Sequence, residues 1–133
     1  MDTGPLVAFM DRAEKHHDWA CKQFRLCPAP LLTCEAVLTE TLFLLRRMPT
    51  AQNRLLELVA RQSLQPIFRL QDEIETIRRL HAKYQDLPMS LADACLVCHS
   101  DSTGLPICTL DSDFTLYRRR DGTPLPLISP VEP

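Results

Sequence analysis

Five carboxylates occupy positions in the sequence where an acidic side chain is unusual. They lie beside or inside apolar segments, at Asp2, Glu40, Asp93, Asp111 and Asp113. Burying a carboxylate costs free energy unless it is paired with another charge or bound to a metal ion. Carboxylates that converge on one place need a hard cation, and we expect these five to bind Mg²⁺ or Mn²⁺.

Each of these carboxylates also has a simpler structural interpretation. Ser90 and Asp93 match a helix capping box, in which Asp93 bonds the backbone at the start of its own helix. Glu40 is compatible with the surface of a helix, and the segment 111–113 with a polar turn. Asp2 is compatible with a frayed terminus. For single residues the sequence leaves both interpretations open.

The elements that must position these residues are indicated by the apolar pattern. Helical spacing predicts helices over 6–10, 18–24, 34–47, 71–85 and 90–100, and one more after Thr50. Short apolar segments predict strands over 31–32, 64–70, 106–110 and 125–129. Thr33 and Thr50 are expected to cap the helices that follow them, and Pro66 to mark an edge strand.

Strands that alternate with helices are typical of an α/β fold with a mostly parallel sheet, because parallel neighbours need helical crossovers. In such sheets the functional groups gather at the carboxyl ends of the strands. We therefore expect the acids that follow strands and the acids at helix starts to meet at one edge of the sheet.

Length and composition restrict the class of protein. The chain has 133 residues, 45% hydrophobic and 24% charged, which predicts a single globular domain over 1–133 and excludes a disordered tail. Without a long apolar segment or a basic leader, the chain is expected to be cytoplasmic and not bound to a membrane. A formal net charge of −2 argues against nucleic-acid binding through a global basic field.

The cysteines suggest other cofactors, which the sequence disfavours. Six cysteines in a cytoplasmic chain are expected to be reduced thiols. Cys95, Cys98 and His99 match a haem-attachment pattern but lie in a helix that is expected to be buried, and zinc would need a further ligand pair. A calcium loop starting at Asp111 fails because Leu116 takes the position of the required glycine.

Two groups of basic residues leave alternatives open. His16 and His17 would be candidates in a metal-free ribonuclease, although adjacent histidines in a polar segment are more often surface residues. Arg118, Arg119 and Arg120 form either a solvated loop or a site that holds RNA phosphates outside the metal site.

Four motifs, in this order, make the whole chain resemble the PIN-domain family, and within it the VapC-type toxin ribonucleases. The motifs cover residues 2–8, which begin Asp-Thr-Gly-Pro, and 33–45, which contain Glu40 inside a helix pattern. The third covers residues 90–94, Ser-Leu-Ala-Asp-Ala, and the fourth residues 109–114, Thr-Leu-Asp-Ser-Asp-Phe. The resemblance implies a three-layer α/β/α domain with a mostly parallel central sheet.

The resemblance also implies an activity, the metal-dependent hydrolysis of RNA that leaves a 5′-phosphate and a 3′-hydroxyl. Metal ions supply hydroxide near neutral pH and stabilise charge on the phosphate. Matched position by position, the catalytic and metal-binding acids are Asp2, Glu40, Asp93 and Asp111, with Asp113 as an auxiliary ligand and Thr3 and Thr109 as supporting hydroxyls. Toxins of this type are expected to pair with a small antitoxin and to form homodimers.

The start of the chain departs from the family pattern. Family members have several apolar residues before the first Asp, whereas here Met1 directly precedes Asp2, so the first strand is expected to be truncated. The alternative function is a catalytically silent PIN-fold module for RNA binding or assembly, although the complete set of acids favours the enzyme. A small α/β phosphatase is disfavoured because Asp2 is followed by Gly4 in place of a second aspartate.

Overall fold

The computed structural model describes residues 1–130, which contain six α-helices, two short 3₁₀ helices and four strands. The helices are α1 (Thr3–Met10), α2 (His17–Leu26), α3 (Glu35–Leu44), α4 (Pro49–Ala60), α5 (Ile74–Lys83) and α6 (Leu91–Thr103). The 3₁₀ helices are η1 (Gln71–Glu73) and η2 (Ser112–Thr115). The strands are β1 (Leu31–Thr33), β2 (Leu64–Pro66), β3 (Ile107–Cys108) and β4 (Leu127–Ile128). Within these residues, no helix is long and apolar enough to span a bilayer.

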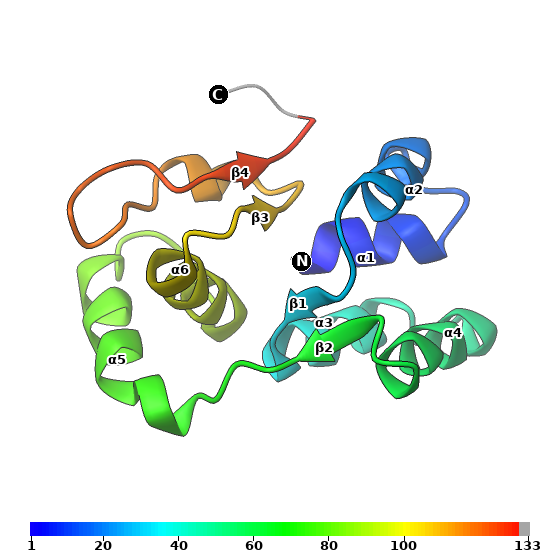
Figure 1. Ribbon diagram of the computed structural model, residues 1–133, viewed down its shortest axis with the longest axis horizontal. Coiled ribbons are helices and arrows are strands. Elements are labelled where there is room, and N and C mark those ends of the chain that lie inside the picture. Colours follow the sequence, from blue (N-terminus) through cyan, green and yellow to red (C-terminus); the bar gives the residue numbers. More distant parts are fainter. Residues whose placement is uncertain (131–133) are drawn as a thin grey trace.

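The strands form two separate parallel pairs (Figure 1). In one pair Leu31 of β1 lies opposite Leu64 of β2, and in the other Ile107 of β3 lies opposite Leu127 of β4. Parallel strands alternating with helices confirm the α/β class. A single continuous sheet is not formed, because the position between β1 and β3 is held by only the first two residues.

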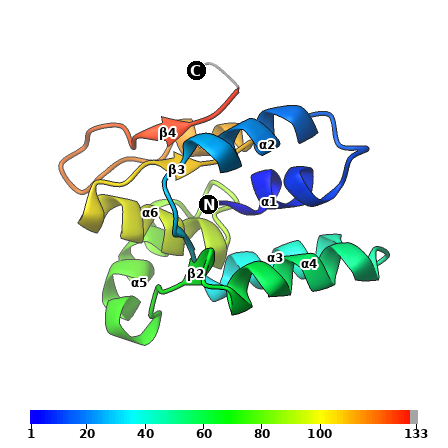
Figure 2. The same cartoon turned by 45° about the vertical axis from the view of Figure 1, so that its right-hand side comes forward.

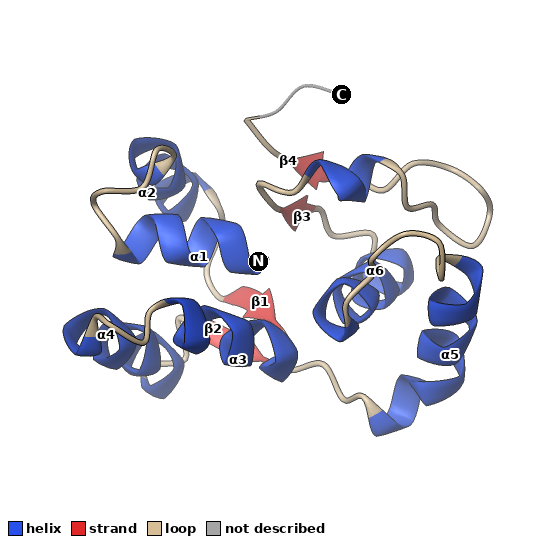
Figure 3. Cartoon of the chain, turned by 180° about the vertical axis from the view of Figure 1, so that it is seen from behind, coloured by secondary structure: helices blue, strands red, loops and turns tan. Residues whose placement is uncertain are grey.

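Residues Met1 and Asp2 join the two sheets (Figure 3). The Met1 ammonium donates to the Leu32 carbonyl of β1 at 2.7 Å, and the Asp2 amide donates to the Cys108 carbonyl of β3 at 3.0 Å. Thr33 adds a side-chain bond to the Met1 carbonyl at 2.8 Å. Asp2 is therefore only 6% exposed, and its interpretation as a frayed terminal residue is wrong.

The helices enclose the core from two sides. Figure 2 shows α1 between α2 and the pair α3 and α4, and α1 packs against all three. On the other side α6 packs against α5, α3 and β3. Helix α6 is buried around most of its surface, as its apolar sequence predicts, and it presents Ala92, Ala94 and Val97 to the core.

Several element boundaries differ from those predicted. The strand expected over 64–70 ends at Pro66, because Pro66 cannot donate to a ladder and the next residue, Ile67, is exposed. Helix α4 begins at Pro49, so Thr50 lies inside it and does not cap it. Thr33 ends β1 and uses its hydroxyl on Met1, which leaves Cys34 as the residue before α3.

Candidate active site

Asp2 is the N-cap of α1, and its carboxylate is fixed through both oxygens. Oδ1 accepts a hydrogen bond from the Thr3 amide at 2.7 Å, and Oδ2 accepts one from the Thr109 hydroxyl at 2.6 Å. Burial raises the pKa of Asp2 above its usual value, the bonds from Thr109 and Thr3 lower it, and the nearby charge of Asp111 raises it again. The site thus holds a desolvated carboxylate in one orientation.

Asp93 lies in the first turn of α6, within a complete capping box. The Asp93 amide donates to Ser90 Oγ at 3.0 Å, and the Ser90 amide donates to Asp93 Oδ2 at 3.1 Å. The capping interpretation is therefore confirmed. Capping uses only Oδ2, and Oδ1 accepts no hydrogen bond from residues 1–130. The pKa of Asp93 is raised first by burial and then by the charges of Asp2 and Asp111.

Asp111 and Asp113 begin η2, directly after β3 and Thr109. Asp111 Oδ1 accepts from the Asp113 amide at 2.9 Å, which makes the segment a polar turn. The Asp111 amide donates to Thr109 Oγ1 at 2.9 Å. Thr109 is fully buried and bonds Asp2 as well, so one hydroxyl connects the two aspartates. Asp111 itself is exposed and faces solvent.

Glu40 reaches this group of acids through a hydroxyl. The Thr3 hydroxyl donates to Glu40 Oε2 at 3.0 Å, from α1 to α3. Glu40 is half-buried, so it is not the solvated helix residue of the simpler interpretation. Thr3 therefore connects Glu40 to the turn of α1 that carries Asp2.

The structure places Asp2, Asp93 and Asp111 at three helix N-termini, near enough for the charge of Asp111 to raise the pKa of both Asp2 and Asp93. A helix N-terminus carries partial positive charge, which compensates part of the negative charge of the acids. In residues 1–130 none of the five predicted acids forms a salt bridge. Across the same residues, no group of three or more His, Cys, Asp or Glu side chains is arranged to hold a metal ion.

The donor set nonetheless fits a hard cation. The acids form no salt bridge in residues 1–130, although the charge of the Met1 ammonium lowers the pKa of Asp2. Mg²⁺ is usually held by one or two carboxylates together with water and substrate phosphates. Asp2 is buried and Asp93 is half-buried. The charge of Asp111 raises the pKa of both, and the charge of Asp2 raises the pKa of Asp93. Asp111, being exposed, lies on the side of the site that a substrate would approach.

Tyr117 belongs to this site, although the sequence pattern did not indicate it. Its hydroxyl donates to Asp93 Oδ2 at 3.4 Å. Burial raises the pKa of Tyr117, and the charges of Asp93, Asp113 and Asp111 raise it further. A buried tyrosine needs a partner for its hydroxyl, but the mostly polar segment 111–120 gave no sign that Tyr117 would be buried.

The remaining candidates take structural positions. His17 Nδ1 donates to the Ala8 carbonyl at 2.7 Å and so ties α2 to α1. Cys95 and Cys98 are buried in α6, and all six cysteines of the chain are free thiols. Arg118, Arg119 and Arg120 leave the acidic site along the loop that follows η2.

Comparison with known protein families identifies the family of this chain. A search of curated proteins found none that matches this chain. Among protein families, the PIN domain matches residues 1–120. Since this match covers most of the 133 residues, the chain belongs to the PIN domain family.

Proposed function

We propose that this protein is a metal-dependent endoribonuclease that hydrolyses RNA phosphodiester bonds, with Mg²⁺ or Mn²⁺ as its cofactor. The PIN domain is a family of nucleases that generally use divalent metal ions, and it implies a nucleic-acid substrate. The observation that supports the proposal best is the electrostatic interaction among Asp2, Asp93 and Asp111, which lie at three helix N-termini. Burial raises the pKa of two of these carboxylates, Asp2 and Asp93, and the charge of Asp111 raises both further.

The residues of the chain are suited to binding and orienting. Asp2 and Asp93 would hold the ion, with Asp111 and Asp113 at the exposed side and Glu40 behind Thr3. When bound, the ion supplies a water of lowered pKa and stabilises charge on the phosphate. Thr109 and the Thr3 amide fix Asp2 from both oxygens, and the capping box fixes Asp93. Such supporting bonds orient carboxylate ligands and limit their movement.

The proposal also includes a biological role for the nuclease. We infer a toxin of a toxin–antitoxin pair that acts on RNA in the cytoplasm, forms a homodimer and is inhibited by a small antitoxin. Support comes from the order of the four VapC-like motifs at residues 2–8, 33–45, 90–94 and 109–114.

One observation favours a second candidate, a catalytically silent module for RNA binding or assembly. In the described residues the acids do not form a group of three arranged for a metal ion. A module of this kind would bind RNA without cleaving it, and its stability would not depend on a divalent cation.

The Asp93→Asn variant separates the two candidates. Asn keeps an oxygen for the capping bond from Ser90, so a role in capping alone predicts a loss of stability of about 1 kcal/mol or less. A ligand role predicts that cleavage of a mixed-sequence RNA in Mn²⁺ is abolished. It also predicts that the metal-free protein melts at an equal or higher temperature, because repulsion from Asp2 and Asp111 is relieved.

The measurements are RNA cleavage with and without EDTA and thermal melts with and without Mn²⁺. Asp86→Asn, at an exposed carboxylate of the loop after α5, is the matched control and should behave as wild type. Cleavage that resists EDTA, together with melting that ignores Mn²⁺, would contradict the metal mechanism. Stabilisation by Mn²⁺ without cleavage of RNA would favour the binding module.

A further inference from the structure

A second concentration of charge lies outside the acidic site, in a cavity between α5, α6 and the loop after η2. The cavity has a volume of about 140 Å³. Five cationic side chains line it: Arg79, Lys83, Arg118, Arg119 and Arg120. Within residues 1–130 its lining contains one carboxylate, Asp101, whose Oδ2 accepts a hydrogen bond from the Arg120 amide at 2.9 Å.

The positive charge of this cavity exceeds its negative charge, because five cations face one carboxylate. None of the five cations forms a salt bridge in the described part of the chain. Arg118 donates to the Thr115 and Tyr117 carbonyls, and Arg79 donates to the Thr76 hydroxyl, which leaves both charges uncompensated. Arg119 Nε is buried and has no hydrogen-bond partner in residues 1–130. A buried N–H group without an acceptor is costly, and an anion in the cavity would supply the acceptor.

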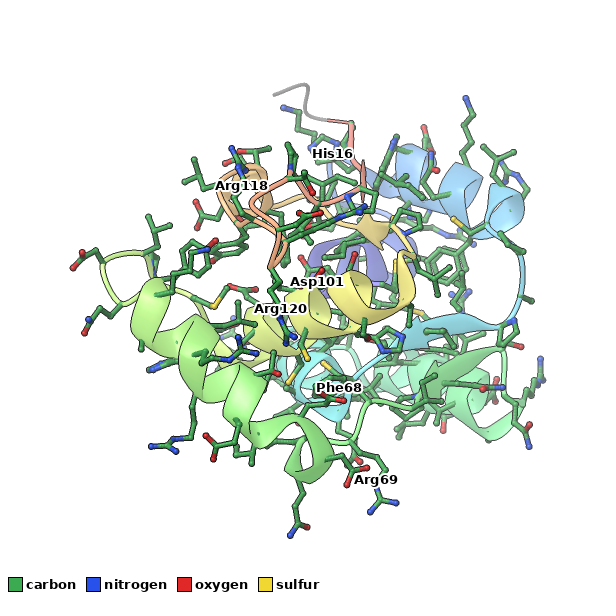
Figure 4. All side chains as sticks on the ribbon, turned by 60° about the vertical axis from the view of Figure 1, so that its left-hand side comes forward. His16, Phe68, Arg69, Asp101, Arg118 and Arg120 are labelled. Atoms are coloured by element: carbon green, nitrogen blue, oxygen red, sulfur yellow. The ribbon has the colours of Figure 1, made fainter. Side chains whose placement is uncertain are left out.

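Helix α6 connects this cavity to the acidic site. Asp93 and Asp101 lie on one face of α6, because residues at spacings of four share a face. Eight residues of α-helix span about 12 Å. The loop after η2 runs beside this face, since Tyr117 bonds Asp93 and the Arg120 amide bonds Asp101. Figure 4 shows Arg120 beside Asp101 over α6, with Arg118 further along the same loop.

We propose that this cavity is a subsite for a backbone phosphate of RNA, occupied when a nearby phosphodiester of the same strand lies at the acidic site. The inference rests on the proposed nuclease function and assigns Arg79 and Lys83 of α5 to substrate binding with the three consecutive arginines. Guanidinium groups bind phosphate oxygens through paired N–H donors, so several of them around one cavity suit a phosphodiester. The subsite holds the strand in register and carries no base specificity.

The first experiment measures binding without cleavage. A fluorescent single-stranded hexaribonucleotide is titrated with protein in EDTA at several salt concentrations. For Arg79→Gln/Arg120→Gln we expect affinity to fall about tenfold or more. The slope of log K against log salt should fall by about 1.4, since each single-strand phosphate contact contributes about 0.7.

The control is Arg12→Gln/Arg54→Gln, which removes the same charge from exposed arginines outside the cavity and should keep both values near those of wild type. Wild-type affinity and slope in the cavity variant would overturn the proposal. So would equal losses in the two double variants, because that result would show a diffuse electrostatic effect.

The second experiment separates this subsite from the cleavage function. In Mn²⁺ the cavity variant should show a raised KM for the hexaribonucleotide and unchanged kcat/KM for a dinucleotide, whose single phosphate reaches only the acidic site. If wild type cleaves neither substrate, the nuclease proposal fails while the binding measurement in EDTA still tests the cavity.

Inorganic phosphate distinguishes the two sources of the anion. Weak competition by millimolar phosphate supports a site for the RNA backbone, because a strand gains from several contacts at once. If phosphate binds the cavity tightly while RNA binds the wild type and the cavity variant equally, the cavity is a site for free phosphate and the assignment to RNA is wrong.

Discussion

Thr109 shows how one buried hydroxyl organises the acidic site. It donates to Asp2 Oδ2 at 2.6 Å and accepts from the Asp111 amide at 2.9 Å, so it bonds groups from the two sides of the site. The bond to Asp2 is buried and the bond from the Asp111 amide is partly buried, while Thr109 itself has no exposed surface. The position of Asp2 relative to Asp111 therefore depends on this residue.

Replacing Thr109 by valine should affect both stability and pH dependence. Val has a similar shape but leaves Asp2 Oδ2 and the Asp111 amide without a partner, which should cost about 1–3 kcal/mol in urea unfolding. Because the bond from Thr109 lowers the pKa of Asp2, its loss should shift the acidic limb of the pH–rate profile to higher pH. Thr109→Ser retains the hydroxyl and should restore the profile. An unchanged profile in the Val variant would show that Asp2 does not titrate in the reaction.

At the residue scale, the sequence indicated the acids and the hydroxyls of Thr3, Ser90 and Thr109 that bond them, but it missed Tyr117. Asp93 stood out as a lone charge in an apolar segment, and the structure shows it half-buried in a capping box. Tyr117 and the cavity arginine Arg79 carried no such signal, because a tyrosine or an arginine is ordinary in a surface helix or loop. Their positions depend on contacts between α5, α6 and the distant loop, which local patterns do not contain.

At the scale of elements, α6 is delimited by two different devices. The capping box with Ser90 begins it, and Gly104 ends it with a left-handed φ of 77°. A left-handed residue at the helix end costs little for glycine and more for any residue with a Cβ. The start of α6 carries Asp93 of the acidic site, whereas its end at Gly104 lies outside that site.

Gly104→Ala should therefore lower stability without altering the acidic site. A Cβ at this position meets no atom within 4 Å, so the cost comes from the backbone alone and should be about 1 kcal/mol in urea unfolding. RNA cleavage should be unchanged. Gly104→Asn should lose less stability, because asparagine tolerates this conformation better. Equal losses for the two variants would point to a cause other than backbone strain.

Helices were easier to predict than strands. The repeat of apolar residues located all six helices, and the helix expected over 90–100 is α6 with Ser90 as its cap. The strands expected over 64–70 and 106–110 are shorter in the structure, where they cover Leu64–Pro66 and Ile107–Cys108. Apolar character continues beyond these strands, whereas pairing depends on a neighbouring strand that local sequence does not specify.

At the scale of the whole molecule, the acidic site couples stability to pH and metal. The pKa values of Asp2 and Asp93 are raised above the usual 3.8, so the folded state binds protons more tightly than the unfolded state. Their contribution to stability is full below pH 3.8 and is lost as the pH rises through the raised pKa values. Above that range Asp2 is charged while buried, and Asp93 is charged while half-buried.

Divalent metal should reverse this loss. Mn²⁺ binds the deprotonated acids, so the rise in melting temperature caused by Mn²⁺ should be small near pH 4 and large near pH 7.5. A ligand at 100 times its Kd contributes about 2.7 kcal/mol when it binds only the folded state. Paired thermal melts across this pH range measure the effect, with Ca²⁺-free buffer and EDTA as the blank. Equal increments at both pH values would show that Mn²⁺ does not bind through Asp2 and Asp93.

The α/β class was predictable from the alternation of elements, and the division of the sheet was not. Within residues 1–130, Met1 and Asp2 join the two parallel pairs through bonds to the Leu32 and Cys108 carbonyls. Such long-range bonds leave no trace in local hydrophobic patterns.

The Asp2 amide proton, which bonds the Cys108 carbonyl, can report on the contact between the two sheets. A buried, bonded amide exchanges with deuterium only when the surrounding structure opens, and the rate measures the free energy of that opening. For Asp2, opening means that its bond to β3 breaks, so that the two sheets separate and the Asp2 carboxylate moves. In NMR exchange spectra, the lifetime of the Asp2 amide signal should therefore report both how stably the two sheets are joined and how stably the Asp2 carboxylate is held.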